Sequence, residues 1–160
     1  MTATTSEETS QTARSAIVPR KVLITGGTGF IGKEILRAYR ARGIEAVGIA
    51  RHPDAALGVV AGDVSDPAPW AHHLEGCDIV YHTAAVVSLV EKREVAWIVN
   101  VKGTQRVINE AASRGVRRFV HVSSVAAMGF ESDEGADETW PLMPNGNTYT
   151  ESKIAAEHTA

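Results

Sequence analysis

A short apolar run that leads directly into a glycine-rich turn is the feature that most constrains the fold of this chain. Val22-Leu23-Ile24 predicts a buried strand, and Gly26, Gly29 and Gly32 follow it at three-residue spacing. Apolar residues then recur at helical spacing, namely Ile31, Ile35, Ala38 and Tyr39. Gly43 comes next, where a helix C-terminal cap belongs. A strand, a tight turn and an amphipathic helix in this order predict the first unit of an α/β sheet.

Four more apolar runs predict strands, and helical patterns separate them. The runs are Ala46–Ala50, Val59–Ala61, Ile79–Tyr81 and Phe119–Val122. Asp66-Pro67 predicts the start of a short helix. A longer helix is predicted by apolar residues on one face, namely Val101, Thr104, Ile108, Ala111 and Ala112, before Gly115. Because several strands are apolar without alternation, we expect a doubly wound parallel α/β sheet of about five strands, a Rossmann fold.

Length and composition bound the organisation of the chain. Its 160 residues suffice for one compact domain, and 44% hydrophobic with 22% charged residues is ordinary for a globular protein. Residues 1–20 are rich in Thr and Ser and lack a hydrophobic period, which predicts a disordered tail. We therefore expect residues 21–160 to form the folded domain.

Charge and cysteine content argue against several classes of protein. A net charge of −3 gives no basic surface for nucleic acid or an anionic membrane. No apolar run reaches the roughly 20 residues of a membrane helix. The single cysteine, Cys77, cannot form an internal disulfide and fits a reducing compartment, which predicts a cytoplasmic protein. No His, Cys or Asp spacing is typical of a metal site, so we expect no metal.

The glycine spacing also has a chemical meaning. Such a turn lets a pyrophosphate approach the backbone, and the helix N-terminus offers free N–H groups and a positive dipole end. We expect Gly26, Gly29 and Gly32 to bind a dinucleotide; the alternative is a tight turn with a purely structural role. Arg51 follows the second strand, where NAD sites carry an acidic residue. Its guanidinium suits a 2′-phosphate and favours NADP, unless Arg51 is a solvated surface residue.

A second set of polar residues lies near the end of the chain. Thr148 and Glu151 predict a capping box that starts a helix. Tyr149 opens this helix, and Lys153 lies four residues later on the same face, where an ammonium stabilises a phenolate that exchanges protons with a substrate hydroxyl. The alternative is a surface pair. Ser123-Ser124 ends the fifth strand, where a hydroxyl either holds a substrate oxygen or caps the next turn.

In chain order these motifs resemble the extended short-chain dehydrogenase/reductase family, from Lys21 to the last residue. The string from Thr25 to Gly32 and the Tyr149/Lys153 pair are the most specific parts. Asp63-Val64 resembles the adenine-binding pair of the family, and the string His82–Ala85 resembles its cofactor-lining H-x-A-A turn. Asn100 begins a string similar to the N-V-x-G-T helix motif. Residues 125–147, rich in Gly and Pro, predict a loop over the site.

The resemblance implies NADP or NAD as the cofactor and a catalytic role for three residues. In this register Tyr149 is the acid or base at the substrate oxygen, Lys153 lowers the tyrosine pKa and binds the nicotinamide ribose, and Ser124 orients the carbonyl or alcohol. The residues implied to bind the cofactor, besides Arg51, Tyr149 and Lys153, are Gly26, Thr28, Gly29, Phe30, Ile31, Gly32, Asp63, Val64, Thr83, Ala84, Ala85 and Asn100.

Within the family, 3β-hydroxysteroid dehydrogenases and dihydroflavonol-type reductases are the most similar in motif. This implies hydride transfer between nicotinamide and a steroid- or flavonoid-like small molecule. The alternatives are a sugar-nucleotide epimerase or dehydratase, and a non-catalytic dinucleotide-binding module or inactive fragment. Family members continue past the Lys153 helix into a C-terminal substrate domain. Because the chain ends at Ala160, we expect that domain to be absent, the fifth strand to be an exposed edge that encourages a homodimer, and turnover by these 160 residues alone to be weak.

Overall fold

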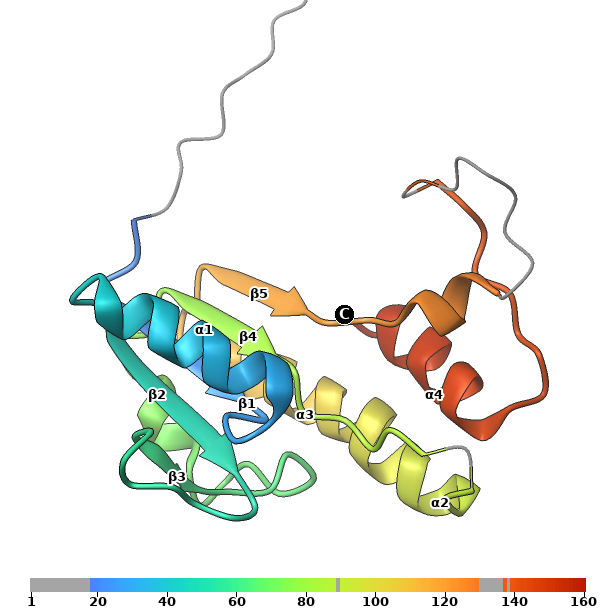
Figure 1. The fold of residues 1–160 in the computed structure, drawn as a ribbon, viewed down its shortest axis with the longest axis horizontal. Helices are drawn as coiled ribbons and strands as arrows, with labels where there is room; N and C mark the ends of the chain where they lie inside the picture. The colour runs from blue at the N-terminus through green and yellow to red at the C-terminus, as the bar shows by residue number, and fades with distance from the viewer. Residues whose placement is uncertain (1–17, 89, 130–136, 138) are drawn as a thin grey trace, which may run out of the picture.

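A five-stranded parallel sheet forms the centre of the molecule. The computed structural model describes residues 18–88, 90–129, 137 and 139–160. The sheet contains β1 (Lys21–Thr25), β2 (Glu45–Ala50), β3 (Val59–Ala61), β4 (Ile79–His82) and β5 (Arg118–His121). Their spatial order is β3-β2-β1-β4-β5, so β1 is central and β3 and β5 lie at the edges (Figure 1). All five predicted strands, the parallel sheet and the Rossmann order are confirmed.

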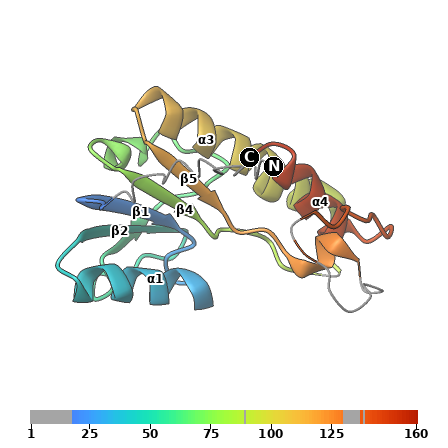
Figure 2. The same ribbon diagram turned by 90° about the horizontal axis from the view of Figure 1, so that it is seen from above.

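Helices cover both faces of the sheet. Helix α1 (Phe30–Ala41) packs on one face, and a continuous helical run packs on the other (Figure 2). That run contains α2 (Arg93–Ala96), the π-helical segment η2 (Trp97–Gly103) and α3 (Thr104–Ser113). Helix α4 (Thr148–Glu157) lies beyond the carboxyl end of β5, beside η2 and the 3-10 helix η3 (Val125–Met128). The carboxyl ends of the strands therefore face α4 and the start of α1.

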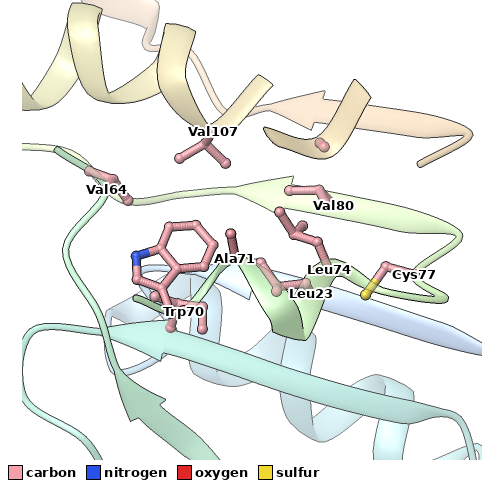
Figure 3. Packing of buried hydrophobic residues seen from close by; sticks show 10 residues of the cluster. Leu23, Val64, Trp70, Ala71, Leu74, Cys77, Val80 and Val107 are labelled. Atoms are coloured by element: carbon pink, nitrogen blue, oxygen red, sulfur yellow. The ribbon is translucent and has the colours of Figure 1, made fainter. Parts of the chain in front are cut away.

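Two apolar clusters, one on each face of the sheet, make the core. Figure 3 shows the larger one, in which Trp70 and Leu74 fill the space between the sheet and Val107 of α3. Trp70 is 1% exposed, and its indole N–H donates to the Asp63 carbonyl at 2.8 Å. Burying a side chain of Leu size contributes about 1.5–3 kcal/mol, so this cluster holds β1, β4 and α3 together. The smaller cluster packs Leu36 of α1 against β1 and β2.

The helices differ in detail from the predicted ones. In α1 the fully buried residues are Gly32 and Leu36, whereas Ala38 is exposed and Ile31 is 47% exposed. The short helix predicted at Asp66-Pro67 is a turn followed by the 3-10 helix η1 (Ala71–Leu74). The Pro67 carbonyl accepts N–H bonds from Trp70 and Ala71, so a hydrogen-bonded turn at the predicted position precedes η1.

The buried face of the long helical run overlaps the predicted one only in part, at Thr104 and Ala111. Its buried residues are Ala96, Asn100, Gly103, Thr104, Val107 and Ala111. Val101 and Ile108 are only half-buried, and Ala112 is exposed. The apolar pattern missed this face because a polar residue, Asn100, lies on it with its amide fully paired.

The ends of the chain and the long loop are described in part. Of the predicted tail, residues 1–17 lie outside the described residues, and the Arg20 N–H donates to the Asp78 carboxylate at 2.8 Å. The predicted loop 125–147 begins with η3, and its residues 130–136 and 138 also lie outside the described part. None of the described helices is long and apolar enough to cross a membrane. No cluster of metal-ligating side chains occurs within the described ranges.

Candidate functional site

The glycine turn after β1 is held by its backbone. The N–H groups of Gly26 and Gly27 both donate to the Ile49 carbonyl of β2, at 2.8 and 3.1 Å. Gly26 has φ +72°, and a Cβ there would lie 2.7 Å from the Thr83 hydroxyl oxygen. A Cβ on Gly32 would lie 2.2 Å from the Gly26 carbonyl oxygen. The turn and the first turn of α1 therefore pack at a distance that only glycine allows.

The start of α1 presents backbone amides rather than side chains. Its N-cap is Gly29, which makes no side-chain hydrogen bond to the first turn. The first side chain of the helix, Phe30, is 82% exposed, and no side chain caps the amide groups of this turn. Backbone N–H groups at a helix N-terminus attract anions, and phosphate above all.

A cavity of about 280 Å³ lies at this end of the sheet. Nine of the residues predicted to bind the cofactor line it, namely Gly26, Thr28, Gly29, Arg51, Asp63, Val64, Thr83, Ala84 and Ala85. Its other lining residues were not predicted and are Ile49, Ala50, His52, Gly62, Val86 and Val99. Gly62 carried a readable signal, because it directly follows β3 and a Cβ there would lie 2.5 Å from Trp70. A glycine-walled cavity beside free helix amides suits a dinucleotide.

Charged groups lie on the far side of this cavity. The Asp63 carboxylate accepts hydrogen bonds from the N–H and the hydroxyl of Ser65, at 2.8 and 2.7 Å. Burial raises the pKa of Asp63, but the Ser65 hydrogen bonds and the Arg51 charge together lower it by more. The pKa of Asp63 is therefore below its ordinary value. Asp63 is therefore ionised at neutral pH, and an anion and a cation, Arg51, share this wall.

A buried polar row lies behind the glycine turn. His82 is 1% exposed, and its ring nitrogens lie 2.8 Å from the Thr25 hydroxyl and 2.9 Å from the Thr104 hydroxyl. Burial, together with the charges of His121 and Lys153, lowers the pKa of His82 to about 3. His82 is therefore neutral at physiological pH. The row links β1, β4 and α3. It also fixes the start of the segment after β4, because the Thr83 hydroxyl donates to the Thr25 carbonyl at 2.7 Å.

Asn100 connects the cofactor-side cavity to the last helix. Its side-chain oxygen accepts from the Val86 N–H at 2.7 Å, and its amide donates to the Val86 carbonyl at 3.0 Å. The same amide donates to the Ser152 hydroxyl of α4 at 2.9 Å. Asn100 is 1% exposed and lies in η2, a π-helical segment of the kind often found at functional sites. Its side chain binds protein groups on each side.

Lys153 lies at the carboxyl end of β5. It is 3% exposed, and its ammonium donates to the Val122 carbonyl at 2.7 Å and lies 3.4 Å from His121 Nε2. Burial lowers the pKa of Lys153 to about 8, although the Glu157 charge opposes the change. Burial and the Lys153 charge likewise lower the pKa of His121 to about 4, so its ring is neutral at pH 7. His121 Nδ1 has no hydrogen-bond partner among the described residues.

The other two predicted catalytic residues flank Lys153. Tyr149 is half-buried in the first turn of α4, and Ser124 caps η3, its hydroxyl accepting from the Ala126 N–H at 3.2 Å. The N-cap of α4 is Asn147 rather than the predicted Thr148, because the Asn147 side chain accepts from the N–H groups of Tyr149 and Thr150. Within the described residues no hydrogen bond joins the side chains of Ser124, Tyr149 and Lys153 to one another. These three residues do not line the 280 Å³ cavity.

Residues 22–160 match the NAD dependent epimerase/dehydratase family. The chain belongs to this family. It is 35% identical over 151 residues to a 3 beta-hydroxysteroid dehydrogenase/Delta 5→4-isomerase of Mycobacterium tuberculosis, which covers 86% of this chain and 41% of the relative. It is 34% identical over 148 residues to a putative dihydroflavonol 4-reductase of Synechocystis, with 86% and 43% covered. The predicted resemblance is confirmed, and the chain spans less than half the length of these relatives.

Solved structures give the same result for the fold. A short-chain dehydrogenase/reductase superfamily protein from Agrobacterium tumefaciens with bound NAD has a TM-score of 0.78 at 31% identity, with 87% of this chain and 43% of that one covered. MoeE5 in complex with UDP-glucuronic acid and NAD has a TM-score of 0.79 at 29% identity, with 88% and 48% covered. Both structures contain NAD and neither name mentions NADP.

Proposed function

We propose that this chain is the coenzyme-binding part of an NAD(P)-dependent oxidoreductase that acts on a hydroxyl or keto group of a steroid- or flavonoid-like molecule. The observation that carries the proposal is the buried Lys153 ammonium at the carboxyl end of β5, one turn after Tyr149 on α4. The names of the M. tuberculosis and Synechocystis relatives support the substrate class. The glycine-walled cavity, the second feature of such an enzyme, lies at the same edge of the sheet.

The coenzyme, when bound, supplies or accepts the hydride at the substrate carbon. The residues of this chain would do the rest. In the reductive direction the Tyr149 phenol gives its proton to the substrate oxygen, and the Lys153 ammonium stabilises the phenolate that remains. Ser124, released from its cap on η3, would donate to the same oxygen. In the oxidative direction the proton moves from the substrate hydroxyl to Tyr149.

Replacing the phenol tests this assignment. In the natural protein that carries this sequence, Tyr149→Phe should lower turnover of a 3β-hydroxysteroid by at least about 100-fold, because the proton-transfer group is lost. Coenzyme affinity should stay within about twofold. Tyr39→Phe is the matched control. Tyr39 lies on α1, and its hydroxyl forms a hydrogen bond with the hydroxyl of Tyr81 on β4, away from α4. A Tyr149→Phe protein with the wild-type rate would exclude Tyr149 as the acid and base.

We further propose that NADP is preferred over NAD, with Arg51 on the 2′-phosphate. The position of Arg51 in the cavity wall supports this, whereas the solved relatives contain NAD. Isothermal titration should give tighter binding of NADPH than of NADH. Arg51→Ala should weaken NADPH about 10-fold and leave NADH unchanged, since a guanidinium–phosphate contact is charge-assisted. Equal affinities in the wild-type chain would contradict this preference.

A second candidate is a sugar-nucleotide epimerase or dehydratase. The similarity to MoeE5, solved with UDP-glucuronic acid and NAD, favours it. In an epimerase the hydride returns to the substrate, so no reduced coenzyme accumulates. Incubation with oxidised coenzyme and either a 3β-hydroxysteroid or a UDP-sugar, followed at 340 nm and by product analysis, separates the two. Net reduced coenzyme with the steroid supports the first proposal.

A further inference from the structure

The end of β5 is held to α4 by three successive residues. The Val122 carbonyl accepts from the Lys153 ammonium at 2.7 Å, and His121 Nε2 lies 3.4 Å from the same ammonium. The Ser123 hydroxyl donates to the Glu157 carboxylate. Lys153 and Glu157 are one helical turn apart on α4, so both contacts come from one face of the helix.

The ammonium of Lys153 has two protein partners, and neither carries a negative charge. It carries three N–H donors, of which Val122 takes one in a short bond and His121 a second in a long one. One donor remains for a ligand. Lys153 is 3% exposed, and burial of a charge is costly unless an opposite charge is close. Lys153 therefore depends on a counter-charge to stay protonated.

Few charged or titratable groups face Lys153 and could provide that negative charge. On β4 and β5 the facing groups are His82 and His121, both neutral at pH 7. On α4 the groups are Tyr149, one turn before Lys153, and Glu151, which pairs with Arg93 of α2 at 2.5 Å. Glu157 lies one turn after Lys153, and its carboxylate is held by Ser123, the residue after the Val122 carbonyl that binds the ammonium. Among the described residues Glu157 and Lys153 form no direct ion pair, and the Glu157 charge opposes the lowering of the Lys153 pKa from this position.

We propose that Glu157 is a positioning residue for Lys153: held in place by the Ser123 hydroxyl, its carboxylate keeps the buried ammonium charged. The proposal rests on the proposed function, in which Lys153 acts as a cation. It gives Ser123 a role separate from that of Ser124: Ser123 orients the counter-ion, and Ser124 faces the substrate. It also assigns Glu157 a function that its exposed position on the last turn of α4 does not suggest.

The test measures the protonation of Lys153 directly. The pKa of the Lys153 side chain is followed by NMR of its Cε and Nζ groups in the complete chain without coenzyme, with Lys153→Met used only to assign the signal. Removing an opposite charge disfavours the charged form, so Glu157→Gln should lower this pKa by about 0.5, a modest shift because Glu157 is solvent-exposed. The alkaline limit of activity should move to lower pH by the same amount.

Matched variants separate this role from a merely structural one. Glu151→Gln makes the same charge change on the same helix and should leave the Lys153 pKa within about 0.2 of wild type. Ser123→Ala should lower the pKa, and Ser123→Thr, which keeps the hydroxyl, should restore it. Circular dichroism melts of each variant check that α4 remains folded.

The outcomes are distinct from those of the coenzyme experiments. A Lys153 pKa that is unchanged in Glu157→Gln, or that falls equally in Glu151→Gln, overturns the role of Glu157. A Ser123→Thr protein that behaves like Ser123→Ala overturns the role of the Ser123 hydroxyl. If instead the chain binds no coenzyme while the Lys153 pKa responds as expected, the proposed function fails and the positioning contact stands.

Discussion

The glycine turn after β1 and the end of β5 lie at the same edge of the sheet, yet different forces hold them. The turn is fixed by backbone hydrogen bonds to Ile49 and by the absence of room for a Cβ on Gly26 or Gly32. The end of β5 is fixed by long side chains of α4, above all Lys153. A side chain added at Gly26 or Gly32 should therefore disrupt the turn. Removal of one polar group, such as the Lys153 ammonium, should disrupt the contact between β5 and α4.

The difference also sets how each region responds to solvent conditions. The glycine turn itself contains no ionisable group, and the histidine behind it, His82, is neutral at pH 7. The region around β5 and α4 contains Lys153 and His121, both with lowered pKa values, so its charge changes with pH. The proposed coenzyme binding therefore involves the glycine turn, and the proposed proton transfer involves the titratable region.

The largest expected effect comes from adding a side chain to the glycine turn. Gly32→Ala should lower the free energy of unfolding by about 3 kcal/mol, because its Cβ would lie 2.2 Å from the Gly26 carbonyl oxygen. Gly115→Ala is the matched control: it has φ +71° but open space around the new Cβ, and should cost roughly 1 kcal/mol. Urea unfolding of both variants measures the difference. Equal losses would show that crowding at Gly32 is not what holds the turn.

A smaller loss is expected from breaking the connection between the two regions. Asn100→Ala leaves the Val86 N–H and carbonyl unpaired in a buried place, which should cost about 2 kcal/mol. Asn109→Ala, at an exposed position on α3, should change the free energy of unfolding by less than about 0.5 kcal/mol. Hydrogen exchange should also rise at Val86 in the first variant. An Asn100→Ala protein as stable as wild type would mean that this amide does not couple cavity and helix.

The pH dependence of stability should reveal the buried His82 behind the glycine turn. Unfolded His82 takes up a proton near its ordinary pKa of about 6.5, whereas in the folded chain its pKa is about 3. Between these values the unfolded state binds more protons, so stability falls as pH falls, by up to about 1.4 kcal/mol per pH unit. His82→Gln should flatten this slope, and the exposed His72→Gln should not. Urea unfolding at pH 5 and pH 7 measures it; identical slopes in all three proteins would contradict a neutral buried His82.

The sequence predicted the backbone region far better than the side-chain region. Each strand and the glycine turn are local signals, because apolar runs and glycines act within a few residues. The N-cap of α4 was misplaced by one residue: Asn147 caps the first turn, and Glu151, expected to complete the cap at Thr148, binds Arg93 instead. That partner is 58 residues away in the chain, and local spacing carries no information about it.

The proposed catalytic residues show the same limit. The pairing of Tyr149 with Lys153 was readable as helical spacing, but the contacts of Lys153 with Val122 and His121 join segments about 30 residues apart. Asn100 was predicted to bind the cofactor. In the structure its side-chain amide forms hydrogen bonds with Val86 and Ser152. Such contacts depend on how β5 and α4 pack, which follows from the whole sheet.

Backbone amide chemical-shift mapping during titration of this chain with NADPH tests the central claim most directly. The claim is that the glycine-walled cavity holds the coenzyme. It predicts that the largest shifts occur at residues 25–32 and 83–86, with a further group at Arg51 and Asp63. The claim is contradicted if neither saturating NADPH nor saturating NADH changes the amide chemical shifts in these segments. It is also contradicted if the changes are confined to the surface formed by Arg40, Pro53 and His73.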